Sequence, residues 1–190
     1  MVKLTRIYTR GGDAGKTSLG SGERVLKSTK RIEAFGTVDE VNSIIGIVRL
    51  HTEKNTHIDK MLFRIQNDLF DLGADLCIPK EGQKHEKSAL RILAKQVERL
   101  EQEIDELNSG IPSLSSFILP GGTEAASYLH LARTITRRAE RIMVDLSNTE
   151  SINSNSLKYI NRLSDHLFVL ARYMNNERKK EILWVPGDNR

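Results

Sequence analysis

The spacing of apolar residues is the feature that most constrains the fold of this chain of 190 residues. In the segment 31–53, apolar side chains from Ile32 to Val48 recur every three or four residues, the period that gathers them on one face of an α-helix. Four later segments repeat the pattern, and none alternates apolar and polar residues as a half-buried strand would. The five predicted helices fall within residues 31–53, 57–76, 88–108, 123–148 and 154–177. They predict an all-α fold, a five-helix bundle packed along apolar seams.

Two polar, proline-containing connections, 78–87 and 109–122, interrupt the helical pattern. Ser88 and Thr123 follow these connections and are predicted to cap the next helices. The first thirty residues are rich in Gly, Thr, Ser, Lys and Arg and show little periodicity, so they predict an irregular arm. We therefore expect one domain over residues 1–190, made of an N-terminal arm (1–30), a helical bundle (31–176) and a C-terminal tail (177–190).

The composition is typical of a soluble globular protein, with 38% hydrophobic and 28% charged residues. No apolar run approaches the length of a membrane span, and the N-terminus lacks the apolar block of a secretory signal. Cys77 is the only cysteine; it excludes an intrachain disulfide, is expected to be a buried, inert thiol, and favours a reducing cytoplasm. The histidines are too scattered for a metal cage. A net charge of +4 fits an anionic ligand without indicating nucleic acid.

A glycine-rich segment, TRGGDAGKTS at residues 9–18, resembles a phosphate-binding P-loop but does not match one. The P-loop pattern requires glycine at position 10, which is Arg10, and a buried strand before the loop. Gly11, Gly12 and Gly15 could still turn backbone N–H groups toward one anion, with donors from the residues that follow. A flexible polar tail would have the same composition.

An arginine stripe is predicted on the fourth helix. Arg133, Arg137 and Arg141 fall on one face, Arg138 borders it, and His130 lies inside it. Leu131, Ile135 and Leu146 are expected on the opposite side. The stripe is either a solvated face or a binding surface for a polyanion such as ATP or a nucleic-acid backbone.

Three shorter motifs also carry polar or special residues. In GTVDEVNS (36–43), Asp39 and Glu40 point about 100° apart on a helix, so they cannot act as a pair, but one could face a neighbour's arginine. In FILPGG (117–122), a turn precedes a helix N-terminus, and Phe117 is either core or exposed for function. Asn161 offers a donor and an acceptor for an adenine or a phosphate.

These residues alone leave several functions open. The basic helix could bind nucleic acid, the chain could be an ATP-dependent kinase or ATPase, or it could be a purely structural helical oligomer. No Ser/His or His/Asp constellation indicates nucleophilic catalysis.

Taken together and in this order, the motifs resemble the PduO-type ATP:cob(I)alamin adenosyltransferases. Residues 51–110 match that family only in helical character, whereas the block 117–141 is highly specific. The matching segments are IYTRGGDAGKTS, Lys27, EAFGTVDEVNS, FILPGGTEAASYLHLARTITRRAER, INRLSDHLFVLAR and ILWVPG. The resemblance implies a five-helix bundle, a homotrimer with ATP sites between subunits, and transfer of the 5′-deoxyadenosyl group of ATP to cob(I)alamin, which yields adenosylcobalamin and triphosphate.

The resemblance also implies roles for individual residues. Phe117 resembles the aromatic residue that displaces the lower ligand of the corrinoid, and Arg133 the arginine that pairs across the interface with an aspartate, here Asp39. The implied ATP-binding residues are Thr9, Arg10, Gly11, Gly12, Thr17, Ser18 and Lys27 in the arm, and Arg137, Arg138, Ala139, Glu140, Arg141 and Asn161 in the bundle. Mg²⁺ is expected with ATP, and a separate, unidentified reductase is expected to supply reduced cobalamin. Neither nucleic acid nor a membrane is an expected partner.

Overall fold

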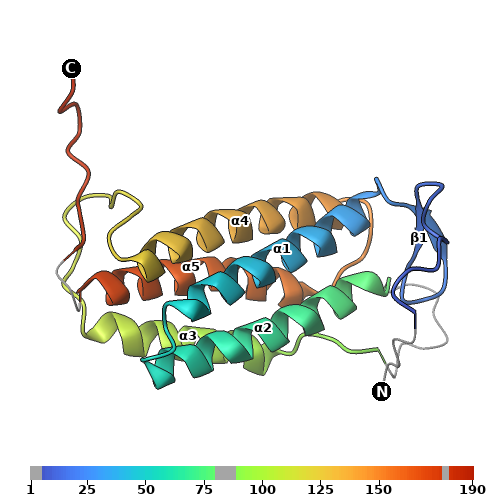
Figure 1. Ribbon diagram of the computed structural model, residues 1–190, viewed down its shortest axis with the longest axis horizontal. Coiled ribbons are helices and arrows are strands. Elements are labelled where there is room, and N and C mark those ends of the chain that lie inside the picture. Colours follow the sequence, from blue (N-terminus) through green and yellow to red (C-terminus); the bar gives the residue numbers. More distant parts are fainter. Residues whose placement is uncertain (1–5, 80–88, 177–179) are drawn as a thin grey trace.

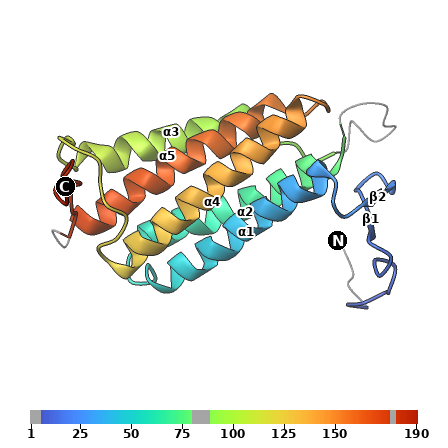
Figure 2. The same ribbon diagram turned by 90° about the horizontal axis from the view of Figure 1, so that it is seen from above.

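The computed structural model describes residues 6–79, 89–176 and 180–190, which form a bundle of five long helices (Figure 1). α4 lies between α1 and α5, α2 packs beside α1, and α3 packs beside α5 (Figure 2). The helices are α1 (Lys30–Leu50), α2 (Thr56–Cys77), α3 (Ala94–Ser109), α4 (Glu124–Ser147) and α5 (Ser154–Asn176). This arrangement confirms the predicted all-α, five-helix fold.

The predicted apolar faces form the core. Val38, Val41 and Ile45 of α1 are completely or almost completely buried, because their spacing places them on the side of α1 that faces α2 and α4. Burial of each such side chain contributes about 1.5–3 kcal/mol. The connection before α4 ends as predicted, since the Thr123 hydroxyl accepts a hydrogen bond of 3.1 Å from the Ala126 N–H and caps the helix.

The start of α3 differs from the prediction. Periodicity suggested a helix from residue 88, but α3 begins at Ala94; the predicted cap, Ser88, lies outside the described residues. Residues 91–93 are held instead by long-range and local hydrogen bonds. The Asp75 carboxylate accepts the Ile92 N–H at 2.9 Å, and the Gln96 side chain accepts the Leu93 N–H at 2.9 Å. Tertiary partners for these backbone groups replace the helical ones.

The N-terminal arm is not wholly irregular. A short antiparallel hairpin joins β1 (Lys16–Ser18) to β2 (Arg24–Leu26), with Thr17 opposite Val25. Strands of three residues are too short to show an alternating pattern, which is why the sequence did not predict them. Gly20 attaches the hairpin to the end of α2, where its N–H lies 3.0 Å from the Cys77 carbonyl oxygen and 3.1 Å from the Cys77 Sγ. Cys77 is only half-buried, so the prediction of a buried thiol was wrong.

Buried acidic residues connect α2, α3 and α5. Asp75 accepts hydrogen bonds from Arg91 and Ser156, and Glu103 forms an ion pair with Arg64 and a 2.9 Å hydrogen bond with His166. Because removing one member of such a set leaves a buried charge unpaired, these contacts specify how the helices align. Across the residues described above, no helix is long and apolar enough to cross a membrane.

Two glutamates of α3 provide a matched test of this buried layer. Glu103 pairs with the fully buried His166, whereas Glu106, one turn later, pairs at 3.2 Å with the exposed His57. We predict that Glu103→Ala lowers the free energy of unfolding by about 3 kcal/mol, and that Glu106→Ala leaves it within experimental error. Urea unfolding at pH 7 measures both. Equal effects of the two substitutions would contradict a structural role for the buried pair.

The same pair predicts a pH dependence. Burial alone would raise the pKa of Glu103, but the hydrogen bond with His166 and the charges of Arg64 and Arg99 outweigh it and lower the pKa below 4.5. The stabilisation is therefore present above about pH 4.5 and is lost as the pH falls through the lower folded-state pKa. Glu103→Ala should lack this part of the acid-induced loss of stability.

Candidate active site

The glycine loop of the arm is held in a compact turn. Arg10 has φ of 58° and Gly15 φ of 75°, and the Gly15 N–H donates to the Gly12 carbonyl at 3.1 Å. Lys27 lies against the glycine loop, because its backbone N–H donates a hydrogen bond of 2.9 Å to the Gly15 carbonyl. A Cβ added at Gly12 would lie 3.0 Å from the Lys27 Nζ. The loop thus brings an ammonium group beside a glycine backbone, a suitable surface for phosphate.

Arg24 is a residue that the motif analysis missed. Its guanidinium donates to the Gly11 carbonyl, and at 3.4 Å to both the Lys16 carbonyl and the Ser18 hydroxyl. The hairpin register places Arg24 opposite Ser18, so one side chain holds both sides of the glycine loop. No local pattern marks it, because the pairing of β1 with β2 creates the contact.

Three arginines of the predicted α4 stripe face outward, whereas His130, which was predicted to lie inside the stripe, is buried. Arg137, Arg138 and Arg141 are exposed, and Ala139 is buried against the core. Among the arginines of this stripe, only Arg138 has an ion pair in the part of the chain that the structure describes, with Glu40 of α1. The prediction for Leu131 was wrong: this residue is 44% exposed, because α4 turns its small residues, such as Ala132, toward its neighbours.

Arg133 and His130 have buried polar atoms without hydrogen bonds. The Arg133 Nε and both ring nitrogens of His130 are buried, and none has a hydrogen-bond partner among the described residues. Burial, and next the charge of Arg137, lower the pKa of Arg133. Burial, and next the charge of Arg133, lower the pKa of His130 to about 4, so its imidazole is neutral at pH 7. A half-buried guanidinium that has no counter-charge in the described part of the chain favours an anionic partner.

Asn161 and Glu140 lie together, as parts of one site would. The Asn161 amide nitrogen donates to the Glu140 carboxylate at 2.8 Å, and its oxygen accepts from Arg162 at 3.0 Å. Arg162 in turn donates to Glu101 at 2.8 Å. This chain of hydrogen bonds fixes which way the Asn161 amide points and leaves Glu140 half-buried beside the arginines.

Asp39 and Phe117 both project from the chain. Asp39 is exposed and lines a hollow of about 460 Å³ between α1 and α2, together with Phe35 and Phe70; within the described ranges, its carboxylate has no hydrogen bond or ion pair. Phe117 is 77% exposed, so it is not a core residue. Its ring centroid lies 6.1 Å from that of Trp184 in the C-terminal tail.

The predicted site residues are spread along the whole molecule, with those of α1, α4 and α5 lying within the helices and not at their ends. The glycine loop lies beyond the start of α1, and the C-terminal tail, which contacts Phe117, lies at the other end of the bundle (Figures 1 and 2). The 24 residues of α4 run between these ends, a length of about 36 Å. No hydrogen bond or ion pair joins the loop to α4 within residues 6–79, 89–176 and 180–190. One chain alone therefore does not assemble all of these residues.

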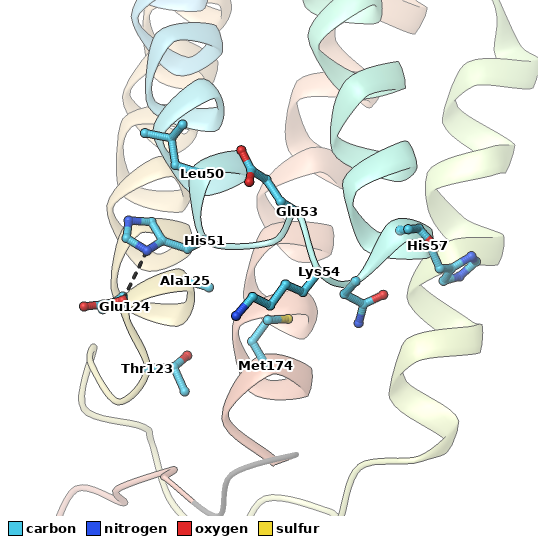
Figure 3. A pocket seen from close by; sticks show the side chains of 11 residues that line it. Leu50, His51, Glu53, Lys54, His57, Thr123, Glu124, Ala125 and Met174 are labelled. Carbon is cyan, nitrogen blue, oxygen red and sulfur yellow. Dashed lines mark ion pairs between the residues drawn. The ribbon is translucent and has the colours of Figure 1, made fainter.

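A separate open hollow lies where α1 ends and α4 begins (Figure 3). His51 points toward Glu124, with 3.2 Å between Nδ1 and the carboxylate, and Lys54 and Met174 lie across from them. None of the sequence-predicted site residues lines it. The described residues also contain no group of three or more His, Cys, Asp or Glu side chains that could hold a metal ion.

Comparison with known proteins decides the family. The family model for cobalamin adenosyltransferase matches residues 7–174. The chain belongs to the cobalamin adenosyltransferase family. A corrinoid adenosyltransferase of Mycobacterium tuberculosis H37Rv is 46% identical over 193 residues, which cover 100% of this chain and 97% of that protein. One of Bacillus subtilis 168 is 42% identical over 173 residues, covering 90% and 86%.

Solved structures agree with this assignment. A variant PduO-type ATP:corrinoid adenosyltransferase from Lactobacillus reuteri, complexed with cobalamin and ATP, superposes with a TM-score of 0.88 at 39% identity. The match covers 95% of this chain and 97% of the other. The family, the fold and the corrinoid adenosyltransferase function predicted from the sequence are therefore confirmed.

Arg24 yields a prediction within this family. We predict that Arg24→Gln raises the KM for ATP more than it changes kcat, because it releases the glycine loop without touching the bundle. Steady-state adenosylation kinetics at varied ATP measure this. Arg24→Lys keeps the charge but loses the fork of donors, so it should show the same defect; a full rescue by lysine would mean that charge alone matters.

Proposed function

We propose that this chain transfers the 5′-deoxyadenosyl group of ATP to the Co(I) of a reduced corrinoid and releases triphosphate. The observation that carries this proposal is the arginine stripe of α4, where Arg133 is half-buried and has no counter-charge among the residues that the structure describes, in a chain that belongs to the cobalamin adenosyltransferase family. Burial of part of a guanidinium favours an anionic partner. A departing polyphosphate, together with a carboxylate from a neighbour, would satisfy these charges.

The site is proposed to lie between subunits of a homotrimer. The glycine loop and the C-terminal tail lie at opposite ends of one chain (Figure 1), and Phe117 contacts that tail. One ATP–corrinoid pair can therefore touch both the loop and Phe117 only if a second copy supplies one of them. Arg133 and Asp39 fit the same assembly. Each lacks a charged partner within the described residues, so we pair Arg133 of one subunit with the aspartate of the next.

The arm and the stripe would hold the nucleotide together. In the arm, the loop N–H groups and Lys27 face the phosphates, with Thr9, Arg10, Gly11, Gly12, Thr17 and Ser18 around them. On α4 and α5, Arg137 and Arg141 would neutralise the charge that develops on the leaving triphosphate, and Glu140 and Asn161, held by their hydrogen bond, would contact the nucleoside. Arg138 keeps Glu40 as its partner and borders the site. Ala139, which the resemblance implied as a nucleotide contact, is completely buried in the core and has no place in this site.

Mg²⁺ is proposed to arrive with ATP. Since no preformed cluster of ligands exists among the described residues, phosphate oxygens and water would bind most of the ion, as is usual for nucleotide-bound Mg²⁺. Asp13 is the one carboxylate inside the glycine loop, is exposed, and could bind the ion or one of its waters. When bound, Mg²⁺ would neutralise part of the triphosphate charge.

The chemistry needs alignment more than acid–base catalysis. Co(I) is a strong nucleophile that attacks C5′ in line while the bond to the triphosphate oxygen breaks, so no proton must be removed. The protein's task is to place two large substrates in line.

Phe117 is proposed to prepare the corrinoid. An exposed aromatic side chain at the corrinoid's lower face would displace the lower ligand and exclude water, which leaves a four-coordinate cobalt that is easier to reduce. A separate reductase would supply the electron. We place the enzyme in the reducing cytoplasm, in keeping with its single cysteine, acting as one domain without nucleic acid or membrane partners.

The direct test mixes the protein with ATP, Mg²⁺ and chemically reduced cobalamin and follows the corrinoid absorption spectrum. Formation of a cobalt–carbon bond with stoichiometric triphosphate is expected. Release of ADP or phosphate instead would indicate phosphoryl transfer, and salt-dependent binding of DNA without adenosylation would indicate the nucleic-acid alternative. Sedimentation measures the trimer independently.

Phe117→Ala should keep ATP binding but slow adenosyl transfer strongly, by about a hundredfold, because the lower ligand is no longer displaced. Calorimetry measures ATP affinity, and single-turnover kinetics measure transfer. Phe117→Leu keeps an apolar side chain, so its transfer rate should fall between those of the wild-type chain and Phe117→Ala. Wild-type turnover in the alanine variant would remove Phe117 from the mechanism.

Arg133→Ala and Asp39→Ala should each reduce kcat/KM, and the double variant should be no worse than the poorer single variant, since either change already breaks the proposed pair. Mixing the two single variants adds a sharper measurement. If the pair forms between subunits, mixed trimers contain some sites free of both substitutions and should recover part of the activity. Simple additivity together with no recovery would refute the pairing.

A further inference from the structure

The C-terminal tail is attached directly to the segment that carries Phe117. Ile118 and Leu183 form an antiparallel bridge. The Leu119 N–H donates to the Ile182 carbonyl at 2.9 Å, and the Trp184 N–H donates to the Phe117 carbonyl at 2.7 Å. Residues 180–184 thus serve as a strand partner for the Phe117 segment, even though more than 60 residues separate them in sequence.

Arg172, near the end of α5, anchors this pair of segments to the bundle. Its guanidinium is 5% exposed and donates at 3.0 Å to Glu181 of the tail and at 2.7 Å to the Pro112 carbonyl, upstream of Phe117. A buried arginine that holds two separate segments fixes both relative to the helix. We call the Arg172–Glu181 ion pair the tail latch.

Asn175, one turn later on α5, holds the other side of the same segment. Its side chain donates at 2.9 Å to the Gly121 carbonyl and accepts at 2.9 Å from the Thr123 N–H. Gly122 has φ of 103°, and a Cβ there would lie 2.3 Å from the Asn175 Oδ1, so only glycine permits this approach. The backbone carbonyl of Asn175 also accepts a hydrogen bond of 3.0 Å from the Lys180 N–H.

These tethers matter because Phe117 has little else to hold it. The ring is 77% exposed, lies outside the helices, and has Trp184 of the tail as its aromatic neighbour. A core residue is positioned by packing on every side, whereas the position of Phe117 depends on its backbone.

We propose that the tail latch, Arg172 with Glu181, positions Phe117 at the corrinoid, so that the C-terminal tail is a working part of the active site. Arg172 and Glu181 are positioning residues, because they act through the Phe117 segment. The inference rests on the proposed role of Phe117. Asn175 fixes the end of the segment where α4 begins, and the latch fixes the end where the tail crosses it.

The test compares Glu181→Ala with the wild-type chain. Trp184 is the only tryptophan, so its fluorescence reports whether the tail is docked. We expect Glu181→Ala to shift the Trp184 emission to longer wavelength and to lower kcat by about tenfold to a hundredfold, with the KM for ATP unchanged. Glu181→Gln keeps an acceptor for the Arg172 Nε–H and should restore both signals in part.

Two further variants make the test specific. Asp59→Ala breaks a similar ion pair, with Arg49 at 2.8 Å, which joins α1 to α2 and has no hydrogen bond to the tail among the described residues, so it should alter neither signal. In a Phe117→Ala background, Glu181→Ala should cause no further loss of kcat, because the latch has nothing left to position. Electron paramagnetic resonance of the ATP-bound cob(II)alamin complex should show less four-coordinate cobalt in Glu181→Ala.

The outcomes separate the two proposals. Wild-type fluorescence and kcat in Glu181→Ala, or an additive loss in the double variant, would overturn the latch while an impaired Phe117→Ala still supports the function of Phe117. Full activity of Phe117→Ala would overturn the role of Phe117 and the latch with it. Melting temperatures identify any variant that has simply unfolded. In that case the Trp184 emission and kcat of Glu181→Gln, the mildest change, decide whether the latch positions Phe117.

Discussion

The burial of one side of α4 determines where the charges on its other side must lie. Ala132, Ile135 and Ala139 pack against α1 and α5, and the helical period then turns Arg137 and Arg141 outward. Arg133 lies between these two sides, partly desolvated and without a counter-charge among the described residues. Electrostatics therefore favour an anionic partner at this position, and the apolar seam keeps the arginines in place to receive it.

The length of the bundle sets a second constraint. α1 and α4 run antiparallel along most of the molecule (Figure 1). Because the arm precedes α1 and the Phe117 segment precedes α4, the two segments lie at opposite ends of the bundle. Sharing the site between copies is the solution we propose. Arg24, which holds the glycine loop within the arm, and Arg172, which holds the tail to α5, supply the fine positioning.

Much of the site could be predicted from local sequence. Arg137 and Arg141 follow from helical spacing, and Thr123 was correctly predicted as a cap. The contacts that hold the site together could not be predicted in this way. Arg24 reaches Gly11 only because β1 pairs with β2, and Glu181 reaches Arg172 only because the tail returns to α5. Leu131 and Cys77 were misplaced because neighbouring elements, and not periodicity, decide whether such residues are covered.

The sequence by itself determined the helices, the side of each that is buried, and the family, since apolar spacing and the block 117–141 are local properties of the chain. Only the tertiary structure decided that α3 begins at Ala94, that Arg133 has no charged partner among the described residues, and that Phe117 is tethered by the tail. The physical reason is the range of the interactions. Helix periodicity acts over four residues, whereas these contacts join residues brought together only when five helices pack into one bundle.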